Sequence, residues 1–210
     1  MSGIVGSYFN TRGSGVVAKL GTDGQLFTSS GAGVSQAFEA AAGGGKIGQV
    51  VQTAKTDQTS LGSTSPETTT FTDITGMSVA ITPTAASSKI LILTSLNLST
   101  KGVEYDSGVK MQRDIESAGY ADVAVGDAYG SRSRALFSTL NKGHDREIFN
   151  RTMTWLDSPS YTLTDVITYK IQWSAMEHNH TIYLNRSGDA TDSAKYFSVP
   201  STITVMEVLA

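Results

Sequence analysis

The stretch Asp165–Ser174 reads DVITYKIQWS, and its large hydrophobic side chains stand at every second position. These positions are Ile167, Tyr169, Ile171 and Trp173, and the residues between them are polar. Because successive side chains of a β-strand point to opposite faces, a period of two predicts a strand with one buried face and one solvated face. Half-buried strands of this kind are typical of antiparallel sheets.

The same alternation recurs from residue 47 to the end of the chain, and clusters of Gly, Ser, Asp, Asn and Pro separate the runs as turns require. We predict eight to ten strands, near residues 47–55, 68–74, 77–82, 88–100, 107–115, 133–140, 147–156, 165–175, 180–185 and 201–209. Residues 116–132 form either a loop or a loop with one extra short strand. Strands of this number and spacing predict an all-β head, an antiparallel β-sandwich of jelly-roll-like type.

Residues 1–46 have a different composition, because eleven of the 21 glycines lie before residue 46. Glycine favours turns and weakens regular elements. Apolar residues nevertheless recur between the glycines, which a free linker would not carry. We therefore predict an extended Gly-rich arm over residues 1–46 and a β-sandwich head over residues 47–210. Within the arm, residues 34–42 form either a short helix capped by Ser35 or an extended spacer.

Composition and charge exclude several classes of protein. Only 17% of the residues are charged, which argues against a coiled coil, and the net charge of −3 argues against nucleic-acid binding. The chain has no cysteine and no apolar run long enough for a transmembrane helix. The first residues, MSGIVGSYFNTRGSG, lack the pattern of a signal peptide. We expect no nucleic-acid partner and no membrane insertion.

Several phrases of the sequence resemble fibre-like virion proteins of marine and cyanobacterial tailed phages. In the arm and the start of the head the phrase is GSGVVAKLGTDGQLFTSSGAGVSQAFEAAAGGGKIGQVVQT. In the head the phrases are TFTDITGMSVAITPTAASSKILIL, GDAYGSRSRALFSTL, LDSPS, TYKIQW, IYLNRSGDATDSAKY and STITVMEVLA. The resemblance implies a virion fibre or attachment protein with a jelly-roll-like tip, located on the phage particle. It further implies a homotrimer that binds a host-surface glycan or protein, and it carries no catalytic motif.

The arm carries apolar side chains and is too short to bury them in a core of its own. In a virion protein, three arms around one axis would share a core, or the arm would pair with another protein of the tail, collar or capsid. The residues expected to anchor the chain to the virion are Ile4, Val5, Tyr8, Phe9, Val16, Val17 and Leu20.

Tyr120 and Tyr129 bracket an irregular segment that contains Asp122 and Asp127. Tyrosine in a loop suits contact with sugars or proteins, because it offers a large surface at low cost in conformational entropy. We expect these four residues to contact the host receptor. The alternative is that the tyrosines cover the end of the sandwich.

His178 and His180, in the run AMEHNHT, are weak candidates for a metal site. On a strand both would point to one face, and three copies around an axis would bring six imidazoles together, as a transition metal requires. The alternative, which we favour, is a hairpin loop with two solvated imidazoles. We therefore expect no metal and no other cofactor.

Acidic residues occur in pairs such as Glu104 with Asp106 and Asp114 with Glu116, and a glycosidase uses two carboxyl groups at a fixed separation. The spacing does not place any pair in a cleft, and the chain has no GxSxG or zinc-protease motif. We expect a structural protein and not an enzyme. The alternatives are a capsid decoration, cement or head-fibre protein and, second, a polysaccharide-degrading tip enzyme.

Overall fold

The computed structural model of the chain describes residues 25–28, 37–40, 46–62, 69–101, 106–140, 146–176, 180–189 and 191–210. The regular elements in these residues are all β-strands. None of the described segments is a helix with the length and apolarity that a membrane crossing requires. The chain divides into two units, Met1–Gly45 and Lys46–Ala210, so the division lies one residue before the boundary that the composition suggests.

The first unit contains a short antiparallel hairpin. Its strands are β1 (Gln25–Thr28) and β2 (Ala37–Ala40), and Phe27 pairs with Phe38. The helical alternative for residues 34–42 is therefore wrong at Ala37–Ala40. A helix of nine residues is marginal on its own, whereas pairing with β1 gives the backbone of β2 hydrogen-bond partners.

The six-stranded sheet of the second unit is built around β6. Its strands are β3 (Ile47–Lys55), β4 (Thr59–Gly62), β6 (Lys89–Lys101), β10 (Phe149–Asp157), β12 (Thr181–Leu184) and β13 (Ser201–Val208). Strand β10 pairs with one edge of β6 over residues 90–98, so β13 and β12 share the other edge. Because β3 pairs with β13, the main order is β3–β13–β6–β10, and β4 pairs with β12.

The five-stranded sheet is built around β7 and β11. Its strands are β5 (Thr72–Ile81), β7 (Asp106–Ile115), β8 (Ala121–Val123), β9 (Phe137–Leu140) and β11 (Ile167–Ala175). Strand β11 lies between β5 and β7, and β8 and β9 pair with successive parts of β7. The main order is therefore β5–β11–β7–β9.

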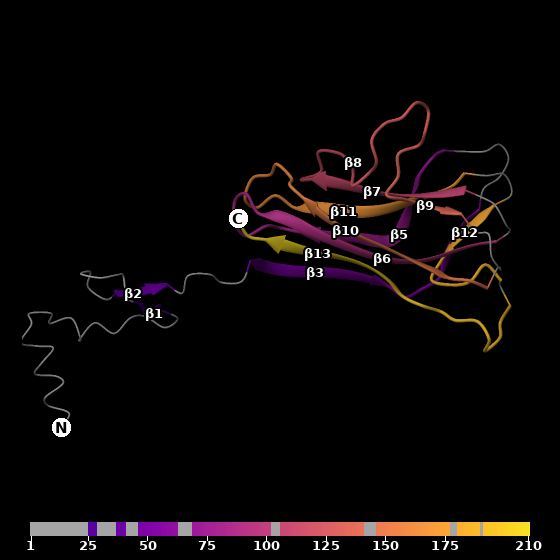
Figure 1. Cartoon of the computed structure of the whole chain (residues 1–210), viewed down its shortest axis with the longest axis horizontal. Coiled ribbons are helices and arrows are strands. Elements are labelled where there is room, and N and C mark those ends of the chain that lie inside the picture. The colour runs from indigo at the N-terminus through magenta and orange to yellow at the C-terminus, as the bar shows by residue number, and fades with distance from the viewer. Residues whose placement is uncertain are drawn as a thin grey trace, which may run out of the picture. The chain divides into compact units, whose positions relative to one another are not determined.

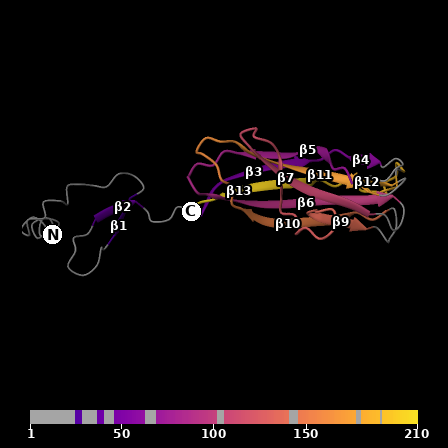
Figure 2. The same cartoon turned by 90° about the horizontal axis from the view of Figure 1, so that it is seen from above.

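The two sheets form two layers, with β7, β8 and β11 in one and β3, β6 and β13 in the other (Figure 1). Figure 2 shows the strands of both layers running in the same general direction, as in aligned sheet packing. The four alternating residues Ile167, Tyr169, Ile171 and Trp173 are all buried, which confirms the face predicted from their alternation. Two antiparallel sheets around one apolar core are consistent with a β-sandwich. The largest fully buried side chains are Tyr169, Met77, Ile90, Ile92, Leu96, Leu98, Met111, Ile167, Ile171, Ile182, Leu184 and Ile203.

A buried charged group joins the two layers. Asp157, at the end of β10, accepts hydrogen bonds from Arg113 Nη1 at 2.7 and 2.8 Å and from the Tyr169 hydroxyl at 2.7 Å. Arg113 and Tyr169 are paired neighbours on β7 and β11. The carboxylate of the six-stranded sheet thus holds two adjacent strands of the five-stranded sheet.

Several elements differ from the sequence prediction. Predicted strands 68–74 and 77–82 both overlap the single strand β5, whose register against β11 shifts near Gly76, a glycine with φ of 82°. Strand β4, TSLG, was not predicted, because it is short and contains one large apolar residue. The region 116–132 does contain one short strand, β8. The strand predicted over 133–140 starts later, at Phe137.

Candidate functional site

Four polar side chains form a compact group on the outer face of the five-stranded sheet. Lys110 pairs with Gln172, and Gln112 pairs with Lys170, across β7 and β11. These residues alternate with Val109, Met111, Tyr169 and Ile171, which are buried, so the four polar side chains point away from the core. We call Lys110, Gln112, Lys170 and Gln172 the outer-face tetrad.

An aspartate on each side of the tetrad binds one lysine and one glutamine. Asp73 of β5 accepts hydrogen bonds from Lys170 Nζ at 3.0 Å and from Gln172 Nε2 at 2.7 Å. Asp122 of β8 accepts hydrogen bonds from Lys110 Nζ and from Gln112 Nε2, both at 2.9 Å. The tetrad and its two aspartates together carry no net charge.

Both aspartates are held in the ionised form. Burial opposes the charge on Asp73, but hydrogen bonds from Lys170 and Gln172 outweigh burial, so the pKa of Asp73 lies below its ordinary value. The pKa of Asp122 is lowered in the same way, against its burial, by hydrogen bonds from Lys110 and Gln112. Ion pairs at a protein surface contribute about 0–1 kcal/mol each to stability. A ligand can therefore compete for these groups at little cost to the fold.

Aromatic rings lie beside the two lysines of the tetrad. The Nζ atom of Lys170 lies 3.8 Å from the centre of the Tyr120 ring, and Nζ of Lys110 lies 4.6 Å from the centre of the Phe71 ring. The side chain of Tyr120 is 43% exposed, so part of the ring remains open to solvent. The face thus offers carboxylates, amides, ammonium groups and an aromatic surface, which together suit recognition of a polar ligand.

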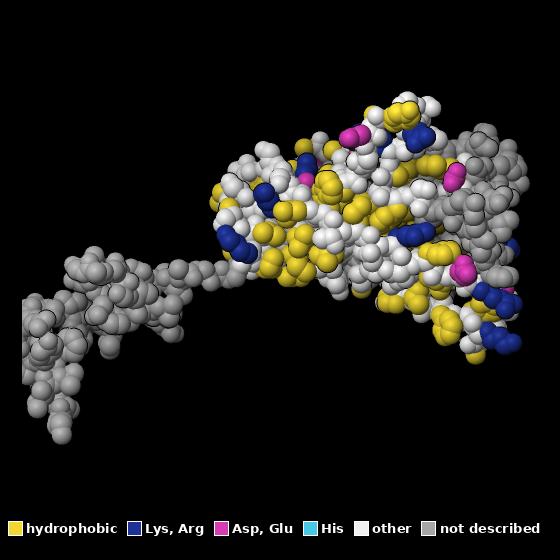
Figure 3. All heavy atoms as spheres, viewed as in Figure 1, with side chains coloured by type: hydrophobic (Ala, Val, Ile, Leu, Met, Phe, Trp, Pro, Cys, Tyr) yellow, Lys and Arg dark blue, Asp and Glu magenta, His cyan; other side chains and the backbone are white. Residues whose placement is uncertain are grey.

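The four predicted receptor-contact residues divide into two pairs. Tyr120 and Asp122 both contact the outer-face tetrad, whereas Asp127 and Tyr129 lie in the loop between β8 and β9. Figure 1 shows this loop as a protrusion, and in Figure 3 hydrophobic, basic and acidic side chains gather on it. Tyr129 is 72% exposed, and the Arg132 guanidinium lies 5.1 Å from the centre of its ring.

The sequence prediction missed the tetrad itself and Asp73. One signal was present, because the triplet Lys-x-Gln occurs both at residues 110–112 and at residues 170–172. Two such triplets on neighbouring antiparallel strands place each lysine opposite a glutamine. The pairing of the two strands is a tertiary feature, so the repeat alone did not reveal the group.

His180 lies in the core and not in a solvated loop. Its side chain is fully buried, and its Nε2 atom is hydrogen-bonded to Ser107 Oγ at 2.8 Å. Burial lowers the pKa of His180, against the opposing effects of a backbone hydrogen bond at Lys101 and the charge of Asp106. The favoured prediction of two solvated imidazoles is therefore wrong for His180, because β12 begins one residue later and carries it inward.

Other predicted residues lie outside the described ranges. His178 is one of them, and so are all the expected anchoring residues, namely Ile4, Val5, Tyr8, Phe9, Val16, Val17 and Leu20. Among the residues that the structure describes, no group of three or more His, Asp or Glu side chains is placed to hold a metal ion.

Comparison with protein-family models and with curated proteins finds no match to this chain.

Proposed function

We propose that the chain is a structural protein of a tailed-phage virion, a trimeric fibre that attaches the particle to the host surface. Residues 1–46 form the extended arm that mounts the fibre on another virion protein. The head that follows is a jelly-roll-like tip that binds a glycan or protein of the host.

The strand pairing of the head carries the jelly-roll part of the proposal. A jelly roll is one long antiparallel hairpin rolled into two sheets, so its first strand pairs with its last, its second with its last but one, and so on inward. The matching pairs here are β3 with β13, β4 with β12, β5 with β11, β6 with β10, and β7 with β9. Domains of this type occur in viral capsid proteins and lectins.

Support for a fibre comes from the sequence phrases that run through both parts of the chain. The Gly-rich composition of residues 1–46 favours an extended arm over an independent core. The strand order alone does not identify a function, because one fold serves many functions. The attachment role therefore depends on the chemistry of the head surface.

The outer-face tetrad, with Tyr120 and Asp122, is the surface that we propose for attachment. It lies on regular strands, which hold its groups in fixed positions, and it joins polar groups to a half-exposed ring. A contact of this size binds weakly as a single copy. Three copies on one fibre, and many fibres on one particle, would raise the avidity steeply.

Binding of the fluorescently labelled 210-residue chain to marine cyanobacterial cells, measured by flow cytometry, tests this proposal. We expect saturable binding to susceptible strains, and Tyr120→Ala should weaken it about tenfold because truncating an aromatic contact costs about 1–2 kcal/mol. Leu163→Ala, which removes an exposed side chain outside this face, is the control. Equal binding by the Tyr120 variant and the parent chain would exclude the tetrad face as the attachment surface.

A further inference from the structure

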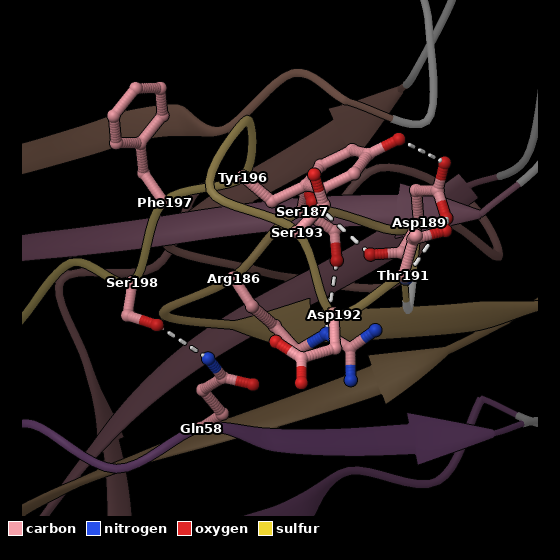
Figure 4. Close-up of a pocket in the computed structure, with 10 residues that line it drawn as sticks. All are labelled: Gln58, Arg186, Ser187, Asp189, Thr191, Asp192, Ser193, Tyr196, Phe197 and Ser198. Atoms are coloured by element: carbon pink, nitrogen blue, oxygen red, sulfur yellow. Dashed lines mark hydrogen bonds between the residues drawn. The ribbon is translucent and has the colours of Figure 1, made fainter.

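A small polar pocket lies between the connection from β12 to β13 and the end of the β3–β4 turn. Its volume is about 220 Å³. Figure 4 shows side chains from both segments around it, with Gln58 and Ser198 on one side and Asp189 and Tyr196 on the other. The groups that matter for the argument are Arg186, Asp189, Asp192 and Tyr196.

The connection between β12 and β13 contacts the sandwich at Asn185, at Gly188 and at Pro200. Asn185 is buried and donates hydrogen bonds from Nδ2 to the carbonyl oxygens of Lys55 and Asp57 at 2.7 and 2.9 Å. A Cβ atom on Gly188 would lie 2.5 Å from the carbonyl oxygen of Thr100, so only glycine fits against β6 there. Asn97 Nδ2 donates to the carbonyl oxygen of Pro200 at 2.6 Å. The pocket is therefore pre-formed.

One of the two carboxylates in the pocket is already occupied by the protein. Asp189 accepts hydrogen bonds from the backbone N–H and the hydroxyl of Thr191, at 3.1 and 2.7 Å, and from the Tyr196 hydroxyl at 2.8 Å. Hydrogen bonds from Thr191 and Tyr196 lower the pKa of Asp189, so it is charged at neutral pH. Its role is to fix the Tyr196 ring and to carry one negative charge.

Arg186 lines the same pocket, and one of its donors has no partner among the described residues. Its Nε atom donates to the carbonyl oxygen of Ser187 at 3.0 Å, and its guanidinium lies 4.8 Å from the centre of the Tyr183 ring. Its Nη2 atom is buried and has no hydrogen-bond partner among the described residues. A buried N–H group without an acceptor is unfavourable, so Arg186 favours an acceptor oxygen within reach of its guanidinium.

We propose that this pocket binds one neutral sugar residue, with a hydroxyl oxygen accepting from Arg186 and another hydroxyl donating to Asp192. The pocket is smaller than those of drug-sized ligands, which matches a single ring. The lining carries two carboxylates and one guanidinium, which disfavours an anion, whereas hydroxyl groups can donate to Asp192 and accept from Arg186. In Figure 4 the ring of Phe197 points away from Arg186 and Asp192, so the contacts proposed for the sugar are the polar ones.

The assignment follows from the lining of the pocket and does not depend on the virion function. The pocket is formed by groups other than the outer-face tetrad, so the two surfaces are tested separately. Loss of cell attachment in the Tyr120 variant tests the tetrad alone, and loss of sugar binding in the Asp192 variant tests the pocket alone.

Saturation-transfer NMR of the 210-residue chain with free neutral monosaccharides tests the proposal, with glucuronic acid as the anionic comparison. We expect saturable binding of at least one neutral hexose or deoxyhexose in the millimolar range. Asp192→Asn should weaken that binding about tenfold, because it removes a charge-assisted hydrogen bond from an exposed position where folding is not at risk. Arg186→Lys, which keeps the charge and loses the planar donor, should weaken it as well.

Glu116→Gln, which neutralises an exposed glutamate after β7 and keeps an acceptor for the Val166 N–H, is the matched control and should leave binding unchanged. Three results would overturn the proposal. These are no binding by any neutral monosaccharide at tens of millimolar, equal binding by the Asp192 and Glu116 variants, or a clear preference for glucuronic acid, which would make the pocket an anion site.

Discussion

Replacing Asp157 by alanine should destabilise the head strongly. The carboxylate is 7% exposed and joins the two layers through Arg113 and Tyr169. Its removal leaves the hydroxyl of fully buried Tyr169 without its acceptor, a loss of about 1–3 kcal/mol. Breaking a fully buried ion pair costs about 3–5 kcal/mol, but the Arg113 side chain is 22% exposed and regains some hydration.

These contributions give a total of about 3 kcal/mol for Asp157→Ala. Tyr169→Phe removes one hydrogen bond and leaves the ion pair in place, so it should cost only about 1 kcal/mol. For a domain of this size, about 3 kcal/mol corresponds to a fall in Tm of about 6–12 °C. Arg113 follows Gln112 on β7, and Tyr169 precedes Lys170 on β11. The contact with Asp157 therefore also positions the proposed attachment face.

Urea denaturation of the 210-residue chain, followed by tryptophan fluorescence, measures these free energies of unfolding. An unchanged slope against urea shows that the variants unfold from the same native state. The double variant with Arg113→Ala should be less destabilised than the sum of the single variants, because the two side chains share one interaction. A loss below about 0.5 kcal/mol for Asp157→Ala, or an equal loss for Tyr169→Phe, would refute the argument that the ion pair joins the layers.

Two further predictions concern the pocket loop and the core histidine. Gly188→Ala should destabilise the head by about 2 kcal/mol in the same urea assay, because the new Cβ would lie 2.5 Å from the carbonyl oxygen of Thr100. Gly126 has open space around it, so the control Gly126→Ala should change stability by less than about 0.5 kcal/mol. Equal effects would show that the loop does not pack against β6 as described. The pKa of His180 is lower in the folded chain than in the unfolded chain, so the unfolded chain binds the extra proton first as pH falls below about 6.5. Stability should therefore decrease from pH 7 to pH 5.5, by at most about 1.4 kcal/mol per pH unit from this group, and His180→Gln should reduce that slope. A slope that the variant leaves unchanged would contradict the buried, neutral state of His180.

The sequence could predict those strands in which apolar and polar residues alternate along the chain. The run DVITYKIQWS predicts both a strand and its buried face, and β11 has that face inward. Strand β4 could not be found this way, because the four residues TSLG contain too little alternation to separate a strand from a turn. The helical alternative at Ala37–Ala40 failed for a related reason, since a four-residue strand depends on its partner β1 and not on its own pattern.

The candidate site was predictable only in part, because its geometry depends on strand pairing. Tyr120 and Asp122 could be chosen from composition, and both reach the outer face of the five-stranded sheet. Lys110 and Lys170 are 60 residues apart, and only the pairing of β7 with β11 brings each opposite a glutamine. His180 shows the opposite error, because a polar residue near a turn was expected in solvent and the start of β12 places it in the core.

The most direct test of the proposed fibre is the mass of the purified chain in solution, measured by light scattering with and without residues 1–46. The proposal predicts three times the chain mass of 22.2 kDa for the 210-residue protein. Dissociation of the shortened protein would place the subunit contacts in the arm, and a trimer that survives the truncation would place them in the head. A monomer for both proteins would contradict the trimeric fibre.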